Sequence, residues 1–394
     1  EQFDLDVDAP EKPILELLPP LEMVRDEDRG LYRITGNDFE FAVDDTTGLI
    51  QSIEKAGVKI GSTSPDVHLW RAPVDNDWGV RGRDSAPLMG GGLGFGEGIA
   101  WDWMELGLEQ LTVQIDSISV EQVSREQVGV SVYGVLLGDG IAFDFETDFN
   151  FFGTGDVVVE RRLRVPYNLG WLQWAAILAL AFWVFSKRVG RRTGWSRRWL
   201  IRIPFILVTL GLVLYLGFSA YSFFKVTPLP RVGSQFKLGQ GFDQMRWYGR
   251  GPFENYSDRN LGSPYGVYEG SVSEQFVPYV HPQENGNKTD TRWVTLTDPA
   301  GMGILVEGDD MSVSAHHYTL ESLSRAGHVP DLKKGDYLTL NIDLAQSGVG
   351  TDFMGSPPLD EFLLDAREYR LRYRFRAIDL SSDDLRPILR TRLP

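Results

Sequence analysis

Apolar and polar residues alternate with a period of two along most of this 394-residue chain, and this period is typical of β-strands. In 141–152, phenylalanines occupy one set of alternate positions, and Asp144, Glu146 and Asp148 occupy the other. In 369–378, Tyr, Leu and Phe alternate with four arginines. Further strands are predicted at 112–123, 129–137, 156–165, 228–238, 244–248, 291–297, 303–307, 312–318 and 337–344.

Turn signals separate these predicted strands. The segment 44–48 (DDTTG) lies between apolar runs at 39–43 and 49–53, with Gly48 where a hairpin turn needs a positive φ. Soluble amphipathic helices are almost absent from the pattern. The fold class predicted is therefore mainly β, a large antiparallel β-sandwich.

One region breaks the alternation. The segments 169–185 and 203–224 contain no charged residue, and each has about the 17–25 residues that a helix needs to cross a bilayer. The loop between them is rich in Lys and Arg and has no acid, which favours the cytoplasmic side. The pattern predicts a transmembrane helical hairpin over 167–227, although a pair of buried core helices is the alternative.

This hairpin predicts a membrane location and a lipid bilayer as partner. The loop 186–202 would be cytoplasmic, and both β arms would lie on the extracytoplasmic side. Because Pro166 and Pro228 would join without it, the hairpin is interpreted as an insertion at a strand connection, where long insertions cost little. Whether it is native or grafted is left open.

Composition excludes several classes of site. The chain has 39 basic and 55 acidic residues, a net charge of -16, which argues against nucleic acid as a partner. It has no cysteine, so disulfides and Cys-ligated zinc are excluded. His316 and His317 are adjacent on a predicted strand and would point to opposite faces. We therefore predict no metal and no cofactor in this chain.

Four stretches carry more specific residue choices than a core requires: 71–79 (RAPVDNDWG), 247–259 (WYGRGPFENYSDR), 278–286 (PYVHPQENG) and 348–352 (GVGTD). Together, and in this order, they resemble the C-terminal, small-chain-like sandwich of family 2 glycoside hydrolases of the β-galactosidase type. The resemblance implies a galactose mutarotase-like β-sandwich interrupted by the hairpin. Residues 29–166 and 228–394 would be its two parts, and 1–28 resembles the end of a preceding immunoglobulin-like domain with a linker.

The resemblance also implies a function. Family members hydrolyse terminal non-reducing β-D-galactose residues with retention, using two carboxylates about 5–5.5 Å apart on a TIM barrel. This chain contains no such barrel, so the partner implied is the catalytic barrel of the same protein or complex, with a β-galactoside as substrate. The fragment alone is predicted to be inactive, and a homo-oligomer is left open.

Residues near the substrate are implied by the same resemblance. The loop after Asp77 would cover the bound sugar, with Gly79 as hinge and Val80 following. Asp352 and Phe353 lie where the family typically places a Trp for the aglycone sugar. Phe353 offers an alternative stacking face, and the aglycone preference is left open.

A polar network is predicted from seven residues of the motifs and their surroundings. Its acids and arginines are suited either to recognising sugar hydroxyls or to forming a buried structural network, and Arg292 is expected to pair with one of the carboxylates. The members are Glu254, Asn255, Asp258, Arg259, Glu284, Asn285 and Arg292.

Two other functions are weighed. A mutarotase-like aldose epimerase would need a His as acid and a carboxylate as base, for which the candidate pairs are His281 with Glu284 and His316 with Glu307. A membrane-held carbohydrate-binding or assembly module would use exposed Trp and Tyr side chains as platforms. The galactosidase hypothesis is preferred because four motifs support it.

Overall fold

The computed structural model describes residues 11–61, 65–79, 98–166, 227–350 and 358–394. Its strands in the first part of the chain are β1 (Glu22–Asp26), β2 (Leu31–Thr35), β3 (Phe39–Asp44), β4 (Ile50–Lys55), β5 (Val58–Gly61), β6 (Asp66–His68), β7 (Thr112–Ser124), β8 (Gln127–Leu137), β9 (Ala142–Phe152) and β10 (Asp156–Arg164). Those in the second part are β11 (Arg231–Leu238), β12 (Gln244–Arg250), β13 (Tyr265–Ser271), β14 (Lys288–Thr297), β15 (Met302–Tyr318), β16 (Lys334–Gln346) and β17 (Glu368–Asp379).

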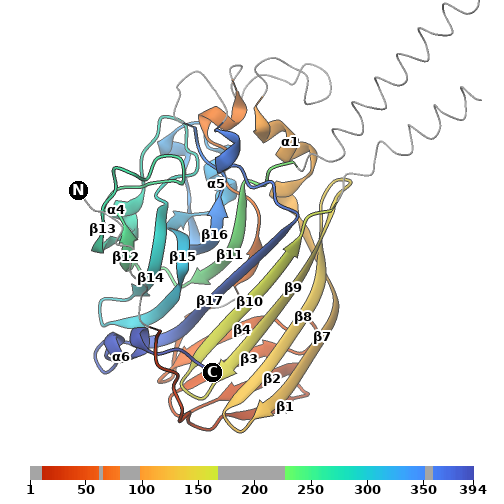
Figure 1. The fold of residues 1–394 in the computed structure, drawn as a ribbon, viewed down its shortest axis with the longest axis vertical. Coiled ribbons are helices and arrows are strands. Elements are labelled where there is room, and N and C mark those ends of the chain that lie inside the picture. Colours follow the sequence, from red (N-terminus) through yellow and green to blue (C-terminus); the bar gives the residue numbers. More distant parts are fainter. Residues whose placement is uncertain (1–10, 62–64, 80–97, 167–226, 351–357) are drawn as a thin grey trace, which may run out of the picture.

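These strands pair antiparallel and form two layers (Figure 1). One layer runs β7–β8–β9–β10–β17–β15–β14–β12–β13. The other runs β1–β2–β3–β4–β5–β11–β16–β15. The long strand β15 belongs to both layers, because its first half pairs with β17 and its second half with β16.

The apolar core lies between the layers. Alternation buries one face of each strand, and the buried phenylalanines meet across the interior. Phe41 on β3 packs edge-on against Phe151 on β9, with ring centroids 5.2 Å apart. Phe236 on β11 packs against Phe375 on β17 at 5.3 Å. These contacts join strands far apart in sequence and confirm the predicted β-sandwich.

The described helices are short. They are η1 (Asp75–Trp78), α1 (Ile99–Glu105), η2 (Leu108–Gln110), α4 (Val272–Gln275), α5 (Leu320–Arg325), η4 (Val329–Asp331), η5 (Asp360–Phe362) and α6 (Leu385–Arg390). Figure 1 shows α1 and α5 at the same end of the sandwich. That end also carries the motif segments described below.

Most predicted strands are present, whereas β5, β6 and β13 were not predicted. Two further differences concern β15 and β1. The segments 303–307 and 312–318 are parts of the single strand β15. The strand β1 lies within 1–28, the range interpreted as a preceding domain and linker, and it pairs with β2. The hairpin turn at 44–48 is confirmed: Gly48 has φ +68°, and the Asp44 carboxylate accepts bonds from the backbone N–H groups of Thr46 and Thr47.

The membrane prediction requires a correction. Residues 167–226 of the predicted hairpin lie outside the described residues. Among the helices that the structure does describe, none is long and apolar enough to cross a membrane. The seven residues of α1, for example, extend only about 10 Å, against about 30 Å of bilayer hydrocarbon. The predicted membrane location, with extracytoplasmic β arms and a cytoplasmic loop 186–202, is therefore wrong for this part of the chain.

The two sides of the predicted insertion point meet in the sandwich. The Val165 backbone N–H donates to the Arg367 carbonyl at 2.9 Å, and the Leu229 N–H donates to the Leu364 carbonyl at 2.8 Å. The Arg367 guanidinium also binds the carbonyl of Pro166 at 3.1 Å. The described residues on both sides of the predicted insertion thus contact the same short segment that precedes β17.

Candidate functional site

The four motif segments come together through hydrogen bonds between their backbones and side chains. The Glu284 N–H donates to the carbonyl of Ala72 at 3.0 Å. The Asn76 amide donates to the carbonyl of Val349 at 3.0 Å, and the Gly350 N–H donates to the Asp258 carboxylate at 2.7 Å. Motif residues up to 277 positions apart in the sequence therefore form one polar cluster.

A buried ion pair holds the first motif. Arg71 Nη2 contacts Asp77 Oδ1 and Oδ2 at 2.8 and 3.0 Å, and both side chains are inaccessible to solvent. The same guanidinium binds the carbonyls of Ser347 and Gly348. Burial raises the pKa of Asp77, and the charge of Arg71 opposes this shift. The Asp77 carboxylate is thus committed to contacts within the protein.

Gly79 directly follows this ion pair. Its φ of +75° lies in the region that favours glycine. The chain returns to this turn at Gly98, where a Cβ atom would lie 2.0 Å from the Asp77 carbonyl oxygen. Trp78 and Trp101 then pack edge-on, with ring centroids 5.1 Å apart. Asp77 and Trp78, which precede Gly79, are thus packed against the start of α1.

A second ion-pair cluster centres on Arg231 of β11. Its guanidinium contacts Glu284 Oε1 at 2.8 Å and Asp343 Oδ2 at 2.9 Å, and all three side chains are buried. One cation thus serves two carboxylates. Burial, reinforced by repulsion from Glu284, raises the pKa of Asp343 to about 7, although Arg231 opposes the shift. The cluster joins β11, β16 and the third motif.

The second and third motifs are joined by amides and Glu254. The buried Asn255 side chain accepts from the Thr289 N–H at 2.8 Å, and its carbonyl accepts from the Asn287 amide at 2.9 Å. Glu254 accepts from the Gly286 N–H at 2.8 Å and contacts Arg259 at 3.2 Å. These bonds hold the two loops in a single arrangement.

The structure brings six of the seven predicted network residues together. Asn285, the sixth, accepts from the Val277 N–H at 3.1 Å. Arg292 lies apart, since its ion pair is with Asp310 at 3.2 Å and both side chains are more than half exposed. The other predicted site residues, Val80, Asp352 and Phe353, lie outside the described residues.

Several members of the cluster were not predicted. Arg231 begins β11 and Asp343 lies between apolar residues of β16, and a charge at an inward position of a strand was the signal available for them. Lys288 is buried beside the Trp247 ring, and burial lowers its pKa to about 8. His316 is buried near Glu284 and Arg231, and burial lowers its pKa to about 4. The ring is therefore neutral at neutral pH.

This arrangement is suited to positioning rather than to proton transfer. The carboxylates of Asp77, Glu254, Glu284 and Asp343 each contact an arginine or a backbone N–H group. Within the described ranges, no group of three His, Asp or Glu side chains has the geometry of a metal site. The cluster fixes the ends of the motif segments at one end of the sandwich.

Comparison with known proteins identifies the family. The model of the beta galactosidase small chain family matches residues 35–376. The chain is 42% identical over 125 residues to a beta-galactosidase of Priestia megaterium, covering 32% of this chain and 12% of that protein. It is 36% identical over 141 residues to a beta-galactosidase of Halalkalibacterium halodurans, covering 35% of this chain and 14% of that protein. The matches thus span about an eighth of these relatives.

Among solved structures, a galactose mutarotase related enzyme from Lactobacillus acidophilus covers 88% of this chain and 97% of its own, at 11% identity and a TM-score of 0.41. A TM-score below 0.5 leaves the classification to the family match and to the antiparallel strand order. The family match covers most of the chain, including β3 to β16 and all the described motif residues. This chain belongs to the beta galactosidase small chain family.

Proposed function

We propose that this chain is the C-terminal, small-chain part of a retaining β-galactosidase that hydrolyses terminal non-reducing β-D-galactose residues. The catalytic carboxylates would lie on a barrel domain outside this chain. The observation that carries the proposal is the family match over residues 35–376. The beta-galactosidases that match the chain are the second support.

In this proposal the polar cluster acts as a rigid structural support. The Arg71–Asp77 pair, the bond from Asn76 to Val349 and the bond from Gly350 to Asp258 hold the described ends of two motif segments together. Such a support would keep the segments that cover the substrate in a productive position. Less conformational entropy would then be lost when the substrate binds. Gly79 would be the hinge, because its positive φ accommodates a change of backbone direction.

A chimera tests the proposal. This chain would replace the corresponding C-terminal part of the Priestia megaterium beta-galactosidase, and hydrolysis of a chromogenic β-galactoside would be measured, with the product anomer followed by NMR. We expect activity with retention from the chimera and none from this chain alone. A chimera that is folded but inactive would overturn the proposal.

The hinge has a matched control. Gly79→Ala in the chimera should lower kcat/KM about tenfold, because alanine disfavours a φ of +75°. Gly140→Ala places the same substitution at a φ of +73°, in a turn with open space around it and no role in the cluster. Equal effects of the two variants on kcat/KM would remove the hinge from the proposal.

The epimerase alternative receives no support from its candidate pairs. His316 and Glu307 lie on the same strand, and Glu307 pairs with Arg374 and Lys12. The His281 ring lies 5.9 Å from that of His328, whereas Glu284 is buried against Arg231. We therefore do not propose epimerase activity.

A further inference from the structure

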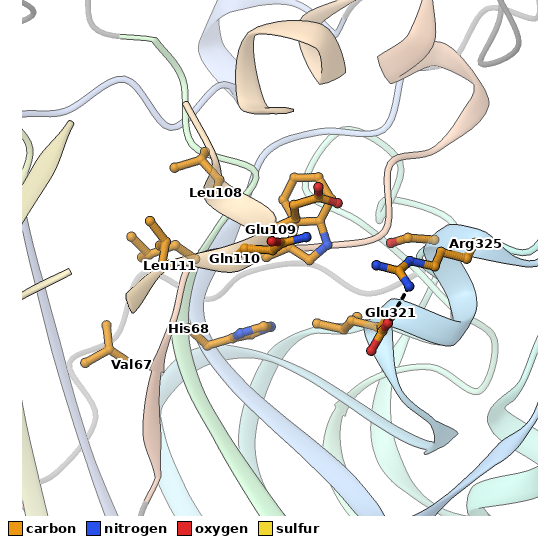
Figure 2. Close-up of a pocket in the computed structure, with 12 residues that line it drawn as sticks. Val67, His68, Leu108, Glu109, Gln110, Leu111, Glu321 and Arg325 are labelled. Carbon is orange, nitrogen blue, oxygen red and sulfur yellow. Dashed lines mark ion pairs between the residues drawn. The ribbon is translucent and has the colours of Figure 1, made fainter. Parts of the chain in front are cut away.

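A cavity of about 360 Å³ lies between β6, η2 and α5 (Figure 2). It adjoins the polar cluster at one residue, His68, which contacts Arg231. Its volume is at the lower end of the range of about 300–1,000 Å³ that is typical of small-molecule sites. The size favours a ligand of one ring rather than a large cofactor.

The floor of the cavity is apolar. Leu69, Trp70 and Leu108 line it, and each is buried in the core. The Trp70 ring packs edge-on against Trp103, with centroids 6.4 Å apart, so its position is fixed before any ligand binds. A preformed apolar floor suits the C–H face of a ligand.

The rim is polar and almost balanced in charge. Glu109 and Gln110 of η2 are exposed at the opening. Figure 2 shows His68 on one side of the cavity and, across from it, the Glu321 and Arg325 side chains, which form an ion pair at 2.7 Å. One arginine against two carboxylates provides no excess positive charge for an anion.

His68 supplies a hydrogen-bond donor. Arg231 Nη1 lies 3.2 Å from His68 Nε2, and a guanidinium can only donate, so Nε2 is the acceptor and the ring proton is on Nδ1. Burial, together with the charge of Arg231, lowers the pKa of His68 well below its usual value. The ring is therefore a neutral donor in the wall of the cavity.

Ser324 supplies a second polar group. It lines the cavity from α5, and its hydroxyl oxygen is buried without a hydrogen-bond partner among the described residues. A buried hydroxyl in this condition is costly unless a ligand or water satisfies it. Together with the His68 donor, this hydroxyl indicates a polar occupant.

We propose that this cavity binds a neutral, hexose-sized polyol. Such a ligand presents C–H groups to the floor of Leu69, Trp70 and Leu108, and hydroxyls to His68, Ser324 and Gln110. An anion would meet the excess of carboxylate, and an apolar ligand would leave the Ser324 hydroxyl unpaired. The site would act independently of hydrolysis, so it goes beyond the function proposed above.

Ligand-observed saturation-transfer NMR on the full chain tests the proposal, with D-galactose and D-glucose as probes. We expect saturation transfer and a Kd on the order of 1 mM, as a small polar ligand of about twelve heavy atoms would give. Inorganic phosphate and n-butylammonium are the comparison probes. The proposal is overturned if either comparison probe binds more tightly than both hexoses, or if no hexose signal appears at roughly 10 mM.

Two variants locate the binding. Ser324→Leu fills the cavity and should weaken hexose binding at least about tenfold. Ser119→Leu, the same substitution at an exposed position on β7, should leave binding unchanged. Gln110→Ala, at the exposed rim, should weaken binding several-fold. It replaces Ser324→Leu as the test of the site if that variant does not fold. Equal binding by wild type, Ser324→Leu and Gln110→Ala would overturn the assignment, whatever the outcome of the chimera experiment.

Discussion

Two parts of the interior are held together in different ways. In the middle of the sandwich, Phe41 and Phe151 pack against each other across the layers, as do Phe236 and Phe375. At the end that carries the motifs, the interior contains Arg71 and Arg231 with their carboxylate partners, and these side chains are equally buried. Apolar packing is non-directional, whereas a buried ion pair requires one geometry.

The difference separates stability from positioning. Burying an aromatic side chain removes apolar area from water and is favourable by itself. Burying Arg231 with Glu284 and Asp343 carries a desolvation cost that the ion pairs only partly offset. We infer that the polar end mainly fixes the motif segments, and that the apolar middle supplies most of the stability.

The largest effect is expected for Arg231→Met. The substitution leaves Glu284 and Asp343 buried without their cation and should lower the free energy of unfolding by about 3–5 kcal/mol. Urea denaturation followed by circular dichroism measures it. The triple variant Arg231→Met, Glu284→Leu, Asp343→Leu should regain part of that loss, because no uncompensated charge remains. A single variant as stable as wild type would contradict the contrast.

The second prediction concerns pH. Burial raises the pKa of Asp343 to about 7, against 3.8 for an exposed aspartate, so the native state keeps a proton that the unfolded chain loses near pH 4. The contribution of Asp343 to the free energy of unfolding is therefore largest below about pH 4 and is lost as the pH rises to about 7. Relative to Asp343→Asn, wild type should lose about 2 kcal/mol between pH 5 and 7, because the limit is about 1.4 kcal/mol per pH unit. Urea midpoints measured at intervals across that range test this, and a constant difference between the two proteins would disprove it.

A smaller effect is expected in the apolar middle. Phe375→Leu keeps an apolar side chain and loses the edge-on contacts with Phe236 and Phe41, so the free energy of unfolding should fall by about 1–1.5 kcal/mol. The same urea titration measures it, and the chimera should keep its KM. A loss above about 3 kcal/mol would show that the middle is as sensitive to geometry as the polar end.

The layered β-architecture was accessible from the sequence because it depends on local alternation. In β17, Tyr369, Leu371, Tyr373 and Phe375 are buried as predicted, and the intervening arginines lie on the opposite face of the strand. The pairing of strands was not accessible, since β15 bridges two layers through contacts with β16 and β17 that no local pattern specifies. The membrane interpretation rested on composition in a range that the described structure does not include.

The site was accessible only in part. Glu254, Asn255 and Glu284 stood out because they belong to motifs. Arg231 and Asp343 did not, because a single charge within an apolar strand also fits an exposed edge or a strand end. Their roles depend on β11 and β16 lying next to each other, with Arg231 opposite Gln346. That pairing is a tertiary property.

The smallest effect is expected for Arg292→Ala, which tests the one predicted network residue that lies outside the cluster. Its pair with Asp310 is 52% and 60% exposed, so removing it should change the free energy of unfolding by less than about 0.5 kcal/mol. Arg259→Ala is the matched control, because its partner Glu254 is largely buried and also binds the Gly286 N–H; this variant should cost measurably more. If Arg292→Ala lowered the free energy of unfolding more than Arg259→Ala, Arg292 would belong to the network as the sequence predicted. The distinction between buried positioning groups and surface ion pairs would then be wrong for this residue.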